Sequence, residues 1–149
     1  MSLARWLYRG GRPNRLASVV NRGSAALYAL GLFPNYLVAL EIVGRRSGRA
    51  ITLPMVMAMV DGQRYLVSML GENVDWVRNV RAAGGRAVLR HGRREEVRLE
   101  EVPVEMRAPV LKAYLRRAPG ARPHVAVHKD APLSEFEPIA AQIPVFRVT

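Results

Sequence analysis

The sequence contains no cysteine, which excludes disulfides, thiolate metal sites and cysteine nucleophiles. Acidic residues are also few: 12 Asp and Glu stand against 23 Lys and Arg, a formal net charge of +11 at pH 7. The absence of cysteine fits a cytoplasmic protein. The surplus of positive charge predicts an anionic partner, which is an acidic ligand, nucleic acid or an anionic membrane surface.

Aromatic residues make up only 7% of the chain, which is too few for the stacking platform of a single-strand nucleic-acid binder. We therefore predict no nucleic-acid partner. The phosphate-loop and dinucleotide-binding glycine patterns are both missing. His124 and His128 are four residues apart, but Pro123 and Pro132 disfavour the helix that this spacing needs to bind a metal. No metal site is predicted.

Long hydrophobic runs are missing from the N-terminal part of the chain. Its longest apolar run, Ala25 to Phe33, is about half of the ~20 residues that span a bilayer. Residues 1–50 instead carry eight arginines against the single acidic residue Glu41. We interpret residues 1–36 as a segment of basic amphipathic helices. Packing on the protein's own core and peripheral binding to the inner face of an anionic membrane through residues 1–30 both remain open.

Residues 37–149 form the main predicted domain, because strand patterns begin at Leu37. Half of all residues are hydrophobic, and 149 residues suffice for one buried core. Pro54 predicts an edge strand or a bulge, and Asp61-Gly62 is typical of a two-residue hairpin. The expected strands are 37–43, 51–60 (interrupted at Pro54), 63–70, 86–91, 93–102 and 143–149.

Three helices are expected between these strands. The first covers 74–83, with Asn73 as its N-cap and Gly84-Gly85 as its end. The second covers 103–117, where Pro109 forces a late start or a kink. The third covers 134–142, with a capping arrangement at Ser134. The predicted apolar side of the second helix comprises Met106, Val110, Leu111 and Tyr114. The predicted fold class is α+β: a small barrel of about six mostly antiparallel strands with inserted helices.

The connection Gly44 to Arg49 is the strongest candidate for a ligand site. It places three arginines and a serine between two apolar strands. Guanidinium groups bind phosphate and carboxylate through paired hydrogen bonds, so this turn suits an anion. A solvated hairpin turn, whose arginines serve only solubility, is the alternative interpretation.

Three segments in order carry a family resemblance. They are Gly44–Arg49 followed by Pro54, Val67-Ser68-Met69-Leu70-Gly71, and Asp75-Trp76-Val77-Arg78-Asn79. With them, residues 37–149 resemble the deazaflavin (coenzyme F-420)-dependent nitroreductase and quinone reductase family. The resemblance implies a split β-barrel related to the FMN-binding barrels, and coenzyme F-420 as the ligand.

The resemblance also implies roles for particular residues. Arg45, Arg46, Ser47, Gly48 and Arg49 match the turn that binds the coenzyme's anionic tail. The other matched positions line the ring pocket: Pro54 and Met55 under the tricyclic ring, Ser68, Met69 and Leu70 through their backbone, and Trp76 and Asn79 from the adjacent helix. From the residues alone, Trp76 is equally a core tryptophan and Asn79 a capping or surface amide.

The implied function is transfer of a hydride from reduced F-420 to a quinone, an enone or a nitro compound. Tyr114 is the candidate proton donor or acceptor-pocket residue, with a core-packed tyrosine as the alternative. A second hypothesis is a non-catalytic barrel that binds a lipid or fatty acid at a membrane surface. A third is FMN, another flavin or a haem-related ligand in the same barrel.

Overall fold

The structure is a computed structural model, and it describes residues 24–26, 28–31 and 36–149. It contains a seven-stranded sheet in the order β2-β1-β5-β6-β7-β4-β3, in which every neighbouring pair is antiparallel. The strands are β1 (Leu37–Val43), β2 (Ala50–Val56), β3 (Ala58–Val60), β4 (Gln63–Val67), β5 (Arg86–His91), β6 (Arg93–Glu101) and β7 (Val145–Val148).

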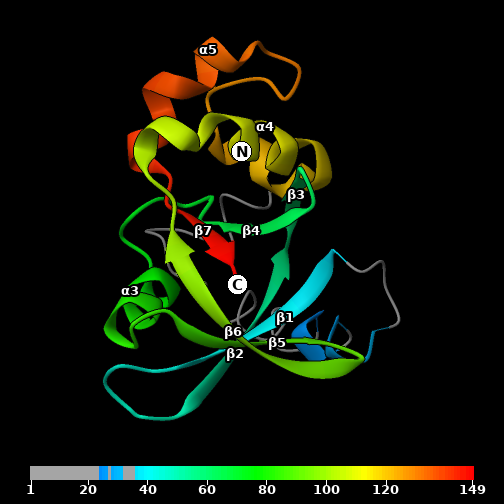
Figure 1. The fold of residues 1–149 in the computed structure, drawn as a ribbon, viewed down its shortest axis with the longest axis vertical. Helices are drawn as coiled ribbons and strands as arrows, with labels where there is room; N and C mark the ends of the chain where they lie inside the picture. The colour runs from blue at the N-terminus through cyan, green and yellow to red at the C-terminus, as the bar shows by residue number, and fades with distance from the viewer. Residues whose placement is uncertain (1–23, 27, 32–35) are drawn as a thin grey trace.

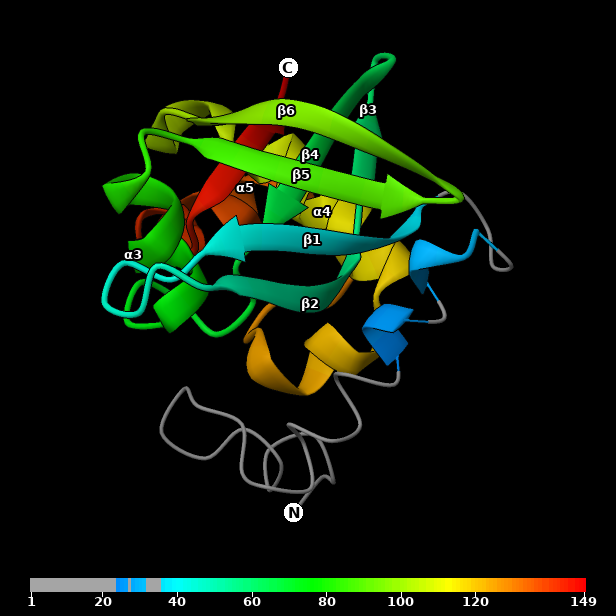
Figure 2. The same ribbon diagram turned by 90° about the horizontal axis from the view of Figure 1, so that it is seen from below.

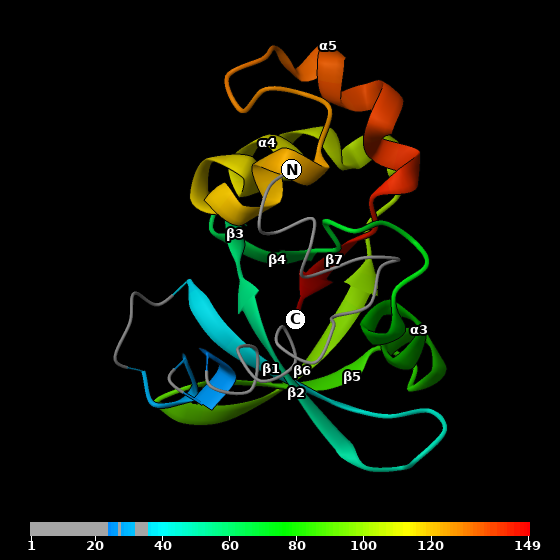
Figure 3. The ribbon, with the colours of Figure 1, turned by 180° about the vertical axis from the view of Figure 1, so that it is seen from behind.

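The sheet curls into two halves that share β6 (Figure 1). The first part of β6 pairs with β5, up to the Arg86–Arg98 pair, and its last residues, 99–101, pair with β7. On the other side, β2 continues into β3 through Met57 alone, so one bent stretch of chain belongs to both halves. Figure 3 shows the same two halves from behind. This arrangement is the expected split β-barrel, with seven strands rather than six.

The seventh strand arises because the break in residues 51–60 falls at Met57 and not at Pro54. Pro54 pairs with Ala39 inside β2. Since β2 is an edge strand, the missing N–H of proline costs the sheet no hydrogen bond. The edge prediction for Pro54 is confirmed. The Asp61-Gly62 hairpin is also confirmed, with φ of 51° and 76° as a type I′ turn requires.

The helices follow the predicted order with shifted starts. They are α3 (Asp75–Ala82), η2 (Val104–Met106), α4 (Ala108–Arg117), η3 (Pro119–His124), α5 (Leu133–Phe136) and η4 (Glu137–Gln142). Pro109 gives α4 a late start, because proline fits only the first turn of a helix. The stretch 118–132, for which no helix or strand was predicted, contains η3. Strand β4 ends at Val67, three residues before the predicted end.

Three local predictions about helix ends are wrong. Asn73 does not cap α3, since Val74 is the N-cap and the Asn73 Oδ1 accepts from Arg78 Nη2 at 3.2 Å. Ser134 lies inside α5, whose N-cap is Pro132. Met106 is 63% exposed because it belongs to η2 and not to the buried face of α4.

The core consists of two clusters, one in each half of the sheet. The first lies between β1, β5, β6 and α3, and the second lies under α4 and α5 at one end of the molecule (Figure 1). Val74, Val77 and Val80, which share one side of α3 by their spacing, belong to the first cluster. Val110, Leu111 and Tyr114 of α4 belong to the second. The main domain is therefore filled by the residues whose periodicity marked them as apolar.

The predicted N-terminal helices lie mostly outside the described residues. Residues 24–26 and 28–29 are helical, and the prediction of helices over residues 1–23 lies outside the described residues. In Figure 2 these short helical pieces lie beside the β5–β6 hairpin. No helix within the described part of the chain is long and apolar enough to cross a membrane.

Candidate functional site

The main pocket lies along the edge strand β2 and has a volume of about 730 Å³. One side of β2 contributes Ile51, Leu53 and Met55, which alternate along the strand as a shared face requires. The loop after β4 and the start of α3 form the facing wall, and Tyr114 with Arg117 and Ala118 of the α4 region closes one end. Most of this lining is apolar, so the pocket suits a flat hydrophobic ring.

Of the residues predicted for the site, seven line this pocket: Pro54, Met55, Met69, Leu70, Trp76, Asn79 and Tyr114. They come from β2, from the loop after β4, from α3 and from α4. The structure therefore brings together segments that are up to 60 positions apart in the sequence, between Pro54 and Tyr114.

Asn79 connects the pocket to the arginine turn. Its Oδ1 accepts hydrogen bonds from the Arg45 backbone N–H at 3.0 Å and from Arg45 Nη1 at 2.8 Å. The side chain is 4% exposed, and its Nδ2 has no acceptor within the described part of the chain. Arg45 Nη2 also lies 3.6 Å from Asp75 Oδ1. Asn79 therefore fixes the turn against α3 and offers a buried donor to the pocket.

The rest of the turn projects into solvent at this end of the pocket. Arg46, Ser47, Gly48 and Arg49 are exposed and do not line the pocket itself. Hydrogen bonds hold the turn closed: Gly44 N–H donates to Arg49 O, Gly48 N–H to Gly44 O, and Arg49 N–H to Ser47 Oγ. Gly48 adopts φ of +71°, which suits glycine. Two guanidinium groups are thus presented beside the pocket on a structured loop.

Trp76 forms the wall of the pocket where α3 meets the sheet. Its ring packs at a tilt against Phe146 of β7, with centroids 5.6 Å apart. The core and site interpretations of Trp76 are therefore compatible, because the indole contacts the core on one side and lines the pocket on another.

Ser68 does not present its hydroxyl to the pocket. It is 1% exposed, and its Oγ donates to Gly71 O at 2.7 Å while its N–H donates to Pro144 O. These bonds shape the loop on which Met69 and Leu70 reach the pocket. Ser68 therefore acts on the loop's conformation and not on a ligand through its side chain.

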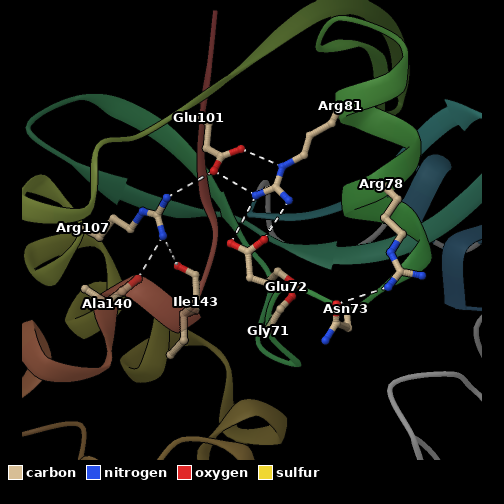
Figure 4. Close-up of polar contacts among 10 residues, drawn as sticks. Gly71, Glu72, Asn73, Arg78, Arg81, Glu101, Arg107, Ala140 and Ile143 are labelled. Carbon is tan, nitrogen blue, oxygen red and sulfur yellow. Dashed lines mark hydrogen bonds and ion pairs between the residues drawn. The ribbon is translucent and has the colours of Figure 1, made fainter.

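An ion-pair network connects this loop to α3 and to β6 (Figure 4). Arg81 of α3 binds Glu72 through two hydrogen bonds of 2.7 and 3.2 Å, and it binds Glu101 of β6 through two of 2.9 Å. The hydrogen bond from Arg81 holds the pKa of the Glu72 carboxyl below its usual value. The negative charge of Glu72 is thus already matched by an arginine.

Arg107 extends the network and was not predicted from the sequence. It is 4% exposed and donates to the carbonyls of Val102, Ala140 and Ile143 and to Glu101 Oε2. Nothing in the local sequence distinguishes it from the other arginines, because its burial follows from the packing of η4 and β7 against the end of β6.

Tyr36 and Arg117 were also missed, and they form the end of the pocket farthest from the arginine turn. Arg117 Cζ lies 4.8 Å from the centre of the Tyr36 ring, a cation–π contact. Tyr114 lies one turn earlier on α4 and is 6% exposed. A second cavity of about 540 Å³ shares Tyr36 and Arg117 with the main pocket.

Comparison with known proteins agrees with this architecture. No curated protein sequence matches the chain. Similar solved structures include one described as a domain-swapped dimer, with a TM-score of 0.56 and 17% identity over 91% of this chain and 94% of that one. Another is an F420-H2 dependent reductase, with a TM-score of 0.53 and 18% identity over 76% and 94%. A haem-binding protein from Mycobacterium smegmatis has a TM-score of 0.50 and 14% identity over 84% and 50%.

At these identities the solved structures show the shared split-barrel fold. The family is shown by a sequence model. The model described as F420H(2)-dependent quinone reductase matches residues 16–130, which is most of the chain and includes the arginine turn, the pocket loop and α3. The chain therefore belongs to the F420H(2)-dependent quinone reductase family.

Proposed function

We propose that this protein binds coenzyme F-420 and transfers a hydride from its reduced form to a quinone, an enone or a nitro compound. The observation that carries the proposal is the apolar pocket along β2, which begins beside the arginine turn. The coenzyme combines an anionic tail with a flat aromatic ring system, and the chain has adjacent surfaces suited to each. Membership of the family supports the same coenzyme.

Arg46 and Arg49 would bind the phosphate and acidic tail, because they are exposed on the turn whose Arg45 contacts the pocket residue Asn79. Arg45 would act differently. Two of its donors are engaged by Asn79, so its main effect is to hold the turn in place, with its charge partly balanced by Asp75. Asn79 Nδ2 would donate to a polar atom of the ring system.

Pro54, Met55, Met69, Leu70 and Trp76 would hold the ring and the acceptor against each other and exclude water. When bound, the reduced coenzyme supplies the hydride, which is two electrons and one proton. The acceptor gains that hydride and one further proton. Tyr114 is placed near enough to the pocket to be the candidate donor of this proton, since its ring lines the cavity.

Direct binding tests the proposal against other cofactors of the same fold. Oxidised F-420 is fluorescent, so its titration with the purified protein gives an affinity, and FMN and haem serve as comparisons. We expect saturable binding of F-420 and weaker binding of the other two. Stronger binding of FMN or haem would contradict the choice of coenzyme while leaving the pocket in place.

Removal of the two exposed guanidinium groups tests the tail site. In R46Q/R49Q we expect the affinity for F-420 to fall about tenfold or more at low salt, since a hydrogen bond between charged groups contributes ~1.5–3 kcal/mol. The thermal midpoint should stay unchanged because both side chains are exposed. The fluorescence titration measures the first quantity and circular dichroism the second.

The matched control is R86Q/R98Q, which removes two positive charges from exposed, directly paired positions of β5 and β6 away from the pocket. This control should retain the affinity of the unaltered protein. Equal losses in the two double variants would mean that only the general positive field matters and would remove the turn from the site.

Attachment of residues 1–30 to an anionic membrane is a separate proposal. It is supported by the five arginines and Trp6 within those residues, and flotation of the full chain with anionic vesicles tests it.

A further inference from the structure

The main pocket has an arginine at each end. Ile42 and Ile51 pair at the end next to the arginine turn, and Leu37 and Val56 pair at the other end, beside Tyr36. Ile51 and Val56 are five positions apart along β2, which corresponds to about 17 Å at ~3.3 Å per residue. A group held at the turn is therefore too far away to reach Arg117 directly.

Unlike the adjacent Arg116 and unlike Arg45 at the other end of the pocket, Arg117 has no acidic partner within the described part of the chain. Its side chain stacks over Tyr36, and no carboxylate within the described part of the chain lies in ion-pair distance of it. Arg116, the adjacent residue, lies 3.9 Å from Asp130, and Arg45 lies 3.6 Å from Asp75. Arg117 thus presents an uncompensated guanidinium at the apolar far end of the pocket.

The second cavity extends this positive environment beyond Tyr36. Its basic lining consists of Arg64, His91, Arg93, Arg94 and Arg117, against Glu95 as its acidic member. Glu95 is already engaged by Arg64 through two hydrogen bonds of 2.8 Å. Met57 and Leu89 supply apolar surface in the same cavity. An amphipathic anion fits this combination, with its charge toward the arginines and its body against the apolar surface.

We propose that the acceptor in this pocket is an acidic ring compound whose carboxylate is bound by Arg117 and the cavity behind it. That this compound is a hydride acceptor rests on the proposed function. The binding of its carboxylate by Arg117 does not depend on that function. The ring would occupy the Tyr36 end of the main pocket, within reach of a hydride donor held from the opposite end. The carboxylate itself is unchanged when the ring gains a hydride and a proton.

A matched pair of acceptors tests this inference. Anthraquinone-2-carboxylate and anthraquinone-2-carboxamide have the same ring and nearly the same size, and they differ in one negative charge. Calorimetry gives their dissociation constants without coenzyme, and oxidation of reduced F-420 gives KM and kcat for each. The variant is R117Q, and R116Q is the control because Arg116 is exposed on the same turn but does not line either cavity.

We expect the unaltered protein to bind the carboxylate about tenfold more tightly than the amide, as one charged hydrogen-bonded pair allows. R117Q should abolish this preference by weakening the carboxylate alone, with KM raised and kcat retained, while R116Q should keep it. Equal affinity for both compounds in the unaltered protein would overturn the proposal.

Two further outcomes are distinguishable. If R117Q lowers the affinity for F-420 instead, the carboxylate that Arg117 binds belongs to the coenzyme tail, and the inference about the acceptor is wrong. If the protein oxidises no reduced F-420, the proposed function fails, yet the calorimetric preference for the carboxylate still decides whether Arg117 forms an anion site.

Discussion

At the scale of single residues, a buried polar side chain can connect parts of the fold that are far apart in the sequence. Arg107 is the clearest case, because it is a cation with 4% exposure that meets three backbone carbonyls and one carboxylate. Burying a charge is costly unless its hydrogen bonds are satisfied, and here the contacts join two parts of the chain, residues 101–102 and residues 140–143. Arg107 therefore fixes η4 and its C-cap residue Ile143 to the end of β6.

Replacement of Arg107 tests this assignment. In Arg107→Met the carbonyls of Val102, Ala140 and Ile143 lose a donor and Glu101 loses one of its two arginines, so we expect a loss of about 3 kcal/mol in the free energy of unfolding. Arg116→Met, at an exposed arginine, should change it by less than about 0.5 kcal/mol. Urea denaturation measures both, and similar values would contradict the role of Arg107.

Some positions of the candidate site could be predicted because they carry a local sequence signal. The family resemblance predicted Trp76 and Asn79 on a helix beside the ring pocket, and in the structure both line the pocket, with Asn79 also accepting a hydrogen bond from the Arg45 backbone. Their role toward a coenzyme stays a prediction. Arg107, Tyr36 and Arg117 have no such signal. Their positions depend on contacts between elements far apart in the chain, which one sequence does not specify.

At the scale of elements, the hairpin turns could be predicted from local signals, whereas the break between β2 and β3 and the helix caps could not. The hairpins at Asp61-Gly62 and Gly92 were predictable because positive φ selects glycine and its neighbours. The break at Met57 was not, since the residue itself has no turn character. Asn73 failed as a cap because its Oδ1 accepts from Arg78 Nη2 instead. Local propensity thus decided the turns, whereas the start of α3 depends on which hydrogen bond the Asn73 side chain makes.

The loop between β4 and α3 depends on the Glu72–Arg81 ion pair, and this makes part of the stability dependent on pH. Arg81 lowers the pKa of Glu72, and Arg64 lowers that of Glu95, in each case mainly through side-chain hydrogen bonds. The unfolded chain therefore binds protons at a higher pH than the folded protein does. The resulting stability is present above the ordinary carboxyl pKa of ~4.3 and is lost as pH falls through the lowered values.

The variant E72Q should be less stable than the unaltered protein at pH 7 by up to about 1 kcal/mol, the range for a solvent-screened ion pair. The difference should shrink as the pH falls below 4, because the native carboxyl is then protonated too. Urea denaturation from pH 3 to pH 7 measures it. The control E105Q alters an exposed carboxylate outside the ion pairs of the described chain and should show no such trend. A difference independent of pH would contradict the assignment.

At the scale of the whole molecule, the described N-terminal residues are joined to the barrel at one close backbone contact. Gly92 N–H donates to Ala29 O at 2.8 Å, and a Cβ on Gly31 would lie 2.8 Å from Gly92 N. Tyr28, in the same segment, lines the main pocket. The position of this segment beside the β5–β6 turn (Figure 2) therefore depends on this contact, and the position of Tyr28 in the pocket wall depends on the segment.

Gly31→Ala tests this connection, with Gly62→Ala as a control that has a similar φ of +76° but no atom within 4 Å of the added Cβ. Both substitutions incur the ~1–2 kcal/mol cost of a left-handed residue, so the steric contact is what differs. We expect hydrogen exchange at the Gly92 amide to accelerate at least about tenfold in Gly31→Ala only. Exchange at the Leu99 amide, which donates to Gly85 O at 2.7 Å, should stay slow in both. If the Gly92 amide keeps its protection in Gly31→Ala, the segment is held to the barrel by other contacts, and this pair of glycines does not set its position.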